Sequence, residues 1–245
     1  MSLKRKTSLG DIFQSQTIKF IIGEAGVACY IHETAIANLS DSLQALFRSK
    51  KNESTEGSVV WKHLEMDTFT MFMEYAYTQD FTIIDPDQRE DISKMSLMTF
   101  ISMRAPDVAI KYANDYFDKV DDTRESIQHS FEYYMSIARL YNLANQCDLS
   151  ELMDLCIEKV RLSLANSTFD KNDACSVWML LESIWPRTNI EDKFREVLLR
   201  FILFDLRTAM ESAEAVRVLK NTPEISTALL LMAPYSYWVE LTSHY

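Results

Sequence analysis

Apolar side chains near the start of the chain follow two different periods on either side of His32. Before it, "TIKFIIG" (17–23) and residues 27–31 are strand-like runs, separated by a turn at 24–26 that contains Gly26. This pattern predicts a β-hairpin. After it, apolar residues recur every three to four positions, which predicts helices over about 33–38 and 41–49. His32 therefore lies at a predicted corner between a strand and a helix.

The polar and apolar pattern continues with further elements of both kinds. The polar run "SKKNESTEG" (49–57) predicts a loop, and "SVVW" (58–61) predicts a third strand. A longer helix is predicted from Asp67 onward, because Phe69, Phe72, Met73, Ala76 and Tyr77 recur at helical spacing. A short extended segment at 81–84 follows that helix.

The second half of the chain is predicted to be helical. Residues 85–128 carry more acidic than basic side chains and few large apolar ones, which is typical of an exposed acidic insertion, with one helix near 108–117. Two helices are predicted within 131–164, broken at 146–148, and more helices follow from 166 to 245. Capping-box spacing at Asp148 and Glu151, and at Thr188 and Glu191, predicts that helices begin there.

Composition and charge narrow the classes of function. The formal net charge is -11, so we expect no general attraction to nucleic acid or to an anionic membrane. No stretch approaches the roughly 18 apolar residues that span a bilayer, and no signal peptide is visible. The four cysteines lack paired spacing, which favours reduced thiols and a cytoplasmic or nuclear location. Residues 1–16 are expected to form a flexible N-terminus.

The sequence contains no recognisable catalytic, phosphate-binding or metal-binding motif, so we expect no cofactor, no metal site and no catalytic residue. All four glycines lie at or before Gly57, which leaves the rest of the chain without a glycine-rich phosphate-binding loop. A metal site at Cys29 and His32 would need two more ligands, and the other histidines lie in unrelated segments. The sequence therefore gives His32 no partners for catalysis or for metal binding.

The order of these elements resembles the BTB (or POZ) domain family. The resemblance rests on the two strands, "IH" (31–32), the "S..L..LF" helix ending at Phe47, the strand with Trp61 and "DTFTMFMEYAYTQDFT" (67–82). It resumes at 131–165, where Ala138, Tyr141, Leu143, Leu152 and Cys156 match the helix pair of the family. Residues from about 172 to 245 resemble the helical extensions of short fungal BTB proteins.

This resemblance implies an α+β fold, with a small sheet of three or more strands flanked by helices and followed by an all-α extension. The implied domains are a BTB/POZ domain at 17–165, with the acidic insertion at 85–128, and a helical extension at 166–245. The implied core residues are His32, Phe47, Trp61, Phe69, Phe72 and Tyr77. Within this core, the resemblance makes His32, which closes the second strand, a packed structural residue that is half-buried and hydrogen-bonded to a backbone group, rather than a catalytic one. Transcription-factor members carry an acidic and a basic pocket residue, which are replaced here by Gln16 and Glu33.

The resemblance also implies a protein-interaction module that is not an enzyme. BTB domains form dimers through their first helix and a neighbouring N-terminal element, and many bind a cullin. The residues expected to contact protein partners are Ile36, Leu39, Lys51 and Glu53. Two hypotheses stay open: an assembly module that binds itself or another regulator, and a substrate adaptor of a cullin-RING ubiquitin ligase. In cullin-binding members a hydrophobic-x-Glu motif is common, and here Lys51 takes the place of the hydrophobic residue.

Overall fold

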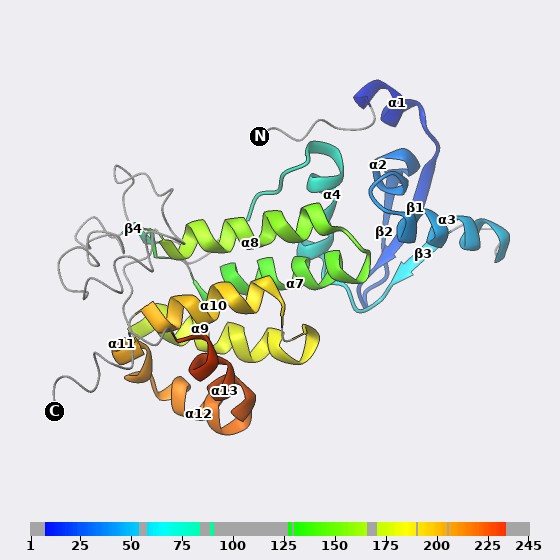
Figure 1. Ribbon diagram of the computed structural model, residues 1–245. Helices are drawn as coiled ribbons and strands as arrows, with labels where there is room; N and C mark the ends of the chain where they lie inside the picture. Colours follow the sequence, from blue (N-terminus) through cyan, green and yellow to red (C-terminus); the bar gives the residue numbers. More distant parts are fainter. Residues whose placement is uncertain are drawn as a thin grey trace, which may run out of the picture. The chain divides into compact units, whose positions relative to one another are not determined.

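The computed structural model describes residues 8–53, 58–83, 89–90, 127–128, 130–165, 171–189, 191–204 and 206–233 (Figure 1). These residues form an α+β protein that is mostly helical and has a small three-stranded mixed sheet. The first unit comprises Met1–Ile84 and Ser136–Cys156, and the second unit comprises Asp85–Met135 and Ile157–Tyr245. Among the helices of the described ranges, none combines the length and the apolar character that crossing a membrane requires.

The first unit contains the sheet. Its elements before residue 84 are α1 (Leu9–Gln14), β1 (Thr17–Ile22), β2 (Val27–His32), α2 (Glu33–Ala37), α3 (Asp41–Glu53), β3 (Ser58–Trp61) and α4 (Met66–Thr78). Strand β1 lies in the centre, antiparallel to β2 and parallel to β3. Gly23 and Gly26 have φ of 70° and 66° and let the backbone reverse between β1 and β2, as the hairpin prediction requires. The predicted hairpin and third strand are confirmed.

The core of the first unit lies on one face of the sheet. Ile18, Phe20 and Ile22 of β1 are buried on this face, as strand alternation requires. The ring of Phe20 lies 6.1 Å from that of Phe47 and 5.5 Å from that of Phe69, in edge-on and tilted geometries. One aromatic cluster thus joins the sheet to α3 and α4.

Half of the predicted core residues are buried and half lie at its margin. Phe47, Phe69 and Phe72 are buried, as predicted. His32, Trp61 and Tyr77 are only half-buried. Tyr75 is buried in place of Tyr77, and desolvation, with smaller contributions from Glu151 and Cys156, raises the pKa of Tyr75 to about 12. The buried face of α4 is therefore rotated from the predicted stripe: it includes Thr68, Met71 and Tyr75, whereas the predicted Met73 and Tyr77 are only half-buried.

The next described elements include a short ladder and two long helices. Strand β4 (Arg89–Glu90) pairs antiparallel with β5 (Ile127–Gln128), so these two described ends of the predicted insertion meet. The helix predicted at 108–117 lies outside the described residues. Helices α7 (Phe131–Gln146) and α8 (Ser150–Ala165) confirm the predicted pair and its break. The division between the two compact units falls within α7, at 135/136, and within α8, at 156/157.

Helices make up the described part of the second unit after residue 165. They are α9 (Lys171–Ile184), the 3₁₀ turn η1 (Trp185–Arg187), α10 (Lys193–Phe204), α11 (Leu206–Met210), α12 (Ala213–Asn221) and α13 (Pro223–Met232). Trp178 of α9 is fully buried, and its Nε1 donates a hydrogen bond to the backbone oxygen of Ala209 at 2.9 Å. The predicted all-α character of this segment is confirmed for its described residues. The aromatic residues of 235–245 lie outside them.

Two of the predicted helix starts were wrong. Helix α8 begins two residues after Asp148, whose φ of 54° places it in the left-handed region at the end of α7. Helix α10 begins at Lys193, where the side chain of Asp192 accepts a hydrogen bond from the backbone N–H of Phe194 at 2.9 Å. Thr188 instead donates its hydroxyl proton to the backbone oxygen of Ile184. The spacing of a capping box was therefore not enough to predict where α8 and α10 begin.

Candidate protein-interaction surface

Helix α1 places apolar side chains on the surface of the first unit. The side chain of Ser8 caps it by accepting a hydrogen bond from the backbone N–H of Asp11 at 3.1 Å. Ile12 is buried, whereas Leu9 and Phe13 are exposed, with 60% of Phe13 accessible to solvent. This segment was predicted to be part of a flexible terminus, which was wrong for residues 9–14. The spacing of Leu9, Ile12 and Phe13 behind a serine was the signal that this prediction missed.

The corner at His32 holds α1 beside the sheet. The ring of Phe13 lies edge-on to the imidazole, with 5.4 Å between the ring centroids. The backbone N–H of His32 donates to the hydroxyl oxygen of Tyr77 at 3.2 Å, and Nδ1 of His32 lies 2.9 Å from the same oxygen. The imidazole is therefore engaged in packing and hydrogen bonding, as predicted, although its partner is a side-chain hydroxyl and not a backbone group.

Two more hydrogen bonds attach this corner to the link between α1 and β1. The backbone N–H of Glu33 donates to the backbone oxygen of Gln16 at 2.8 Å. The hydroxyl of Ser15 accepts a hydrogen bond from the backbone N–H of Thr34 at 3.4 Å. Gln16 and Glu33, the residues that the resemblance matched to a pair of pocket positions, are thus neighbours. Neither brings a basic group to this position.

The outer face of the sheet adds more apolar surface. The register places Tyr30 of β2 opposite Lys19, and Val60 of β3 opposite Ile21, all on the face away from the buried residues of β1. Tyr30 is 67% exposed, and Val60 is also exposed. In the described part of the first unit, the large exposed apolar side chains are Leu9, Phe13, Val27, Tyr30 and Val60. We call Leu9, Phe13, Tyr30 and Val60 the apolar surface; Val27 is left out because it pairs with Ile22 and therefore lies on the other face of the sheet.

The structure places the four predicted contact residues in different surroundings. Ile36 is 1% exposed and belongs to the core, so its side chain offers no surface to a partner. Leu39 is half-buried just after α2, and its backbone N–H donates to the carbonyl of Ile36. Lys51 and Glu53 lie on α3, which continues to Glu53 where a loop was predicted from residue 49. Their side chains lie outside the described part of the chain.

The thiol of Cys147 and the imidazole of His63 lie in very different surroundings. Burial, with a smaller effect of Asp148, raises the pKa of the Cys147 thiol to about 11, which disfavours the nucleophilic thiolate at neutral pH. His63 is almost fully exposed, and its Nδ1 lies 3.6 Å from the carboxylate of Glu24. Within the described ranges, no three histidine, cysteine, aspartate or glutamate side chains are grouped so that they could hold a metal ion.

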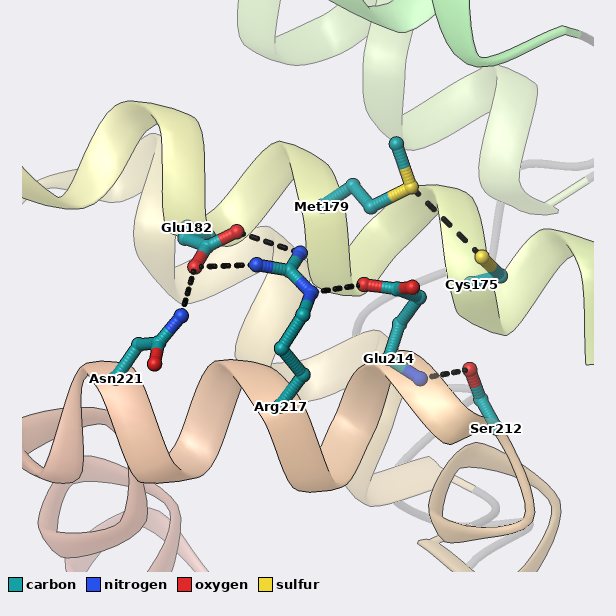
Figure 2. A network of polar contacts seen from close by, with 7 residues as sticks. All are labelled: Cys175, Met179, Glu182, Ser212, Glu214, Arg217 and Asn221. Atoms are coloured by element: carbon teal, nitrogen blue, oxygen red, sulfur yellow. Dashed lines mark hydrogen bonds and ion pairs between the residues drawn. The ribbon is translucent and has the colours of Figure 1, made fainter.

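A polar network in the second unit joins α9 to α12 (Figure 2). The guanidinium of Arg217 donates to both carboxylate oxygens of Glu182, at 2.9 and 2.7 Å, and to the carboxylate of Glu214. The amide of Asn221 also donates to Glu182, at 3.2 Å. The hydrogen bonds from Arg217 are the main reason that the pKa of Glu182 is lowered. Arg217 of α12 and Glu182 of α9 therefore form an ion pair that connects these two helices.

Comparison with known proteins adds no relative. A scan against models of protein families finds no match, and a search among curated proteins finds none either.

Proposed function

We propose that this protein is a non-enzymatic interaction module of the BTB/POZ type, which assembles with a second copy of itself through the apolar surface. The observation that carries the proposal is the position of that surface. The large exposed apolar side chains described in the first unit lie on α1, β2 and β3. Exposed apolar patches of this kind commonly mark interaction sites.

The arrangement of the first unit supports the BTB/POZ assignment. Its elements follow the order on which the resemblance rests: two strands, the "IH" corner, two helices, a third strand and a helix with buried Phe69 and Phe72. The third strand returns parallel to the first, so that a small sheet is flanked by helices. Helix α1 precedes the sheet and presents Phe13, which agrees with the first helix and the N-terminal element as the dimer contacts of the family.

Sedimentation equilibrium of the full chain tests this proposal. We expect a concentration-dependent species of twice the 28.4 kDa of one chain. Burying one phenylalanine contributes about 1.5–3 kcal/mol. Phe13→Asp should therefore raise the dissociation constant of the dimer at least about tenfold while leaving the circular dichroism spectrum unchanged.

Leu231→Asp is the matched control, because Leu231 is 81% exposed on α13 of the second unit. It should leave the dissociation constant unchanged. Equal weakening by both variants would show a general effect of added charge. A dimer that tolerates Phe13→Asp would exclude α1 from the interface.

A further inference from the structure

Strand β2 has an edge that no strand among the described residues covers. The sheet order is β2, β1, β3, so β2 pairs with β1 on one side and presents backbone N–H and C=O groups on the other, except that the N–H of His32 is already bonded to the hydroxyl of Tyr77. Such an edge is a template for pairing with another strand. Figure 1 shows β2 beside β1 in the first unit.

The sequence of β2 lacks the features by which proteins protect a free edge. Its six residues, "VACYIH", contain no lysine, no glutamate and no proline. They pair one-to-one with β1, from Thr17 opposite His32 to Ile22 opposite Val27, so no bulge bends the strand away. Val27 and Tyr30 are exposed on it. Charged residues, proline or a bulge usually prevent an edge strand from pairing with another chain. Because β2 has none of these features, its edge is suited to pairing.

Charge and position favour a second copy as the occupant. The chain carries a formal net charge of -11, so two copies approach most easily where neither presents a carboxylate, and β2 itself has none. A strand that pairs antiparallel with its own copy forms a symmetric contact that closes on itself. The contact between Phe13 and His32 also makes this edge continuous with α1.

We propose that β2 pairs antiparallel with β2 of a second copy, so that two three-stranded sheets join into one continuous sheet. Cys29 lies in the middle of the strand, so the two Cys29 thiols should be neighbours across the symmetry axis. This inference rests on the proposed function, since it specifies how the second copy is bound.

The test uses the full chain in a Cys175→Ser background, because Cys29 and Cys175 are the half-buried free thiols and Cys147 and Cys156 are buried. A short bismaleimide should cross-link the wild-type dimer, and Cys29→Ser should abolish the cross-link. Tyr30→Lys adds a charge to the middle of the free edge and should reduce both cross-linking and dimer formation at least about tenfold. Leu231→Lys, which adds the same charge at an exposed apolar side chain of α13 in the second unit, is the matched control and should preserve both.

The outcomes separate this inference from the proposed function. A dimer that is lost in Phe13→Asp but persists in Tyr30→Lys would retain self-assembly and overturn the pairing of β2. A wild-type chain that stays monomeric at all concentrations would refute self-assembly, and the pairing with it. If that monomer also showed slow alkylation of Cys29, a segment of the same chain would be the occupant of the edge.

Discussion

The hydroxyl of Tyr77 serves two groups of His32 at once. Its oxygen accepts a hydrogen bond from the backbone N–H of His32, while its own proton can be donated to Nδ1, 2.9 Å away. The strand therefore ends at a residue whose backbone and side chain are both held by α4. Phe13 packs against the other part of this ring, so the same residue also positions α1.

Replacing either partner of this pair should destabilise the first unit. His32→Ala removes a hydrogen bond and ring packing, and Tyr77→Phe leaves a half-buried N–H without its acceptor, so each should cost about 1–3 kcal/mol in urea unfolding. The double variant should cost less than the sum, because the two residues share one interaction. His63→Ala is the control, with a change within about 0.5 kcal/mol, since His63 is exposed. A His32→Ala protein of unchanged stability that no longer self-associates would show that His32 is a contact residue instead.

Single residues of the core differ in how well the sequence predicted them. Phe47, Phe69 and Phe72 were predicted because they repeat at helical spacing. The same spacing could not separate Tyr75 from Tyr77, since the two tyrosines lie on opposite sides of Phe69, Phe72 and Ala76 and either one can complete an apolar face with them. The contact between Tyr77 and His32 joins residues 45 positions apart. The apolar and polar pattern of each segment does not predict this contact.

Among the elements, the turn after α9 depends on one buried guanidinium. Nε of Arg195 donates to the hydroxyl of Thr188 at 2.7 Å, and its NH2 group donates to the backbone oxygens of Trp185 and Thr188. The guanidinium carbon also lies 3.9 Å from the centre of the Trp185 ring. One side chain of α10 thus satisfies the polar groups of η1 and stacks on its aromatic residue.

Removing this guanidinium should be costly. Arg195→Ala leaves two carbonyls and a hydroxyl without their donor, and we expect a loss of about 2–4 kcal/mol in the free energy of unfolding. Arg195→Lys keeps the charge but not the planar fork, so it should recover less than half of that loss. Arg187→Ala, an exposed arginine of the same turn, should change stability by less than about 0.5 kcal/mol. Equal effects at both arginines would contradict the role assigned to Arg195.

The bridge between α9 and α12 should depend on pH. The pKa of Glu182 is lowered in the folded protein, mainly by hydrogen bonds from Arg217. Its stabilising effect is therefore present above the pKa of the unfolded chain and is lost as the pH falls through the folded pKa. Glu182→Gln should lower the melting temperature at neutral pH, and the difference from wild type should shrink in acid. A difference that stays constant across this range would show that the charge of Glu182 does not matter.

Element boundaries were the weakest part of the sequence prediction, for two physical reasons. Helix α1 has only six residues and would be marginal in isolation, so its formation depends on packing such as the burial of Ile12. Helix α3 continues through a polar run because Arg, Lys and Glu are good helix formers, and polarity alone does not predict a loop. Both errors bear on the site, since α1 carries part of the apolar surface and α3 carries the predicted contact residues Lys51 and Glu53.

At the scale of the whole molecule, the division into two units was only partly visible in the sequence. The apolar spacing of α8 continues across the division at 156/157, so no linker or change in composition marks it. The apolar surface was also missed. In the sequence, Tyr30 and Val60 look like ordinary strand residues. Their exposure could not be predicted, because it depends on which face of the sheet α3 and α4 cover. The sequence predicted the elements of the first unit better than the surface they leave exposed.

The last prediction concerns the alternative role as a cullin adaptor. A cullin-binding BTB protein needs an apolar anchor in a desolvated pocket, where one buried side chain supplies about 2 kcal/mol or more. Lys51 occupies that position in the motif, two residues before Glu53, where α3 ends. Burying its unpaired ammonium would be unfavourable, so the natural chain should form no stable complex at micromolar concentration with a BTB-selective cullin N-terminal domain.

Lys51→Met should create binding that calorimetric titration detects, because it restores the apolar side chain and keeps Glu53. Lys50→Met is the matched control: it removes the same charge one residue earlier, outside the motif, and should create none. If the unaltered chain binds the cullin tightly and Glu53→Ala abolishes that binding, the adaptor role would replace self-assembly as the best-supported function. The prediction therefore tests the choice between the two functions at one side chain, whatever the outcome for the dimer.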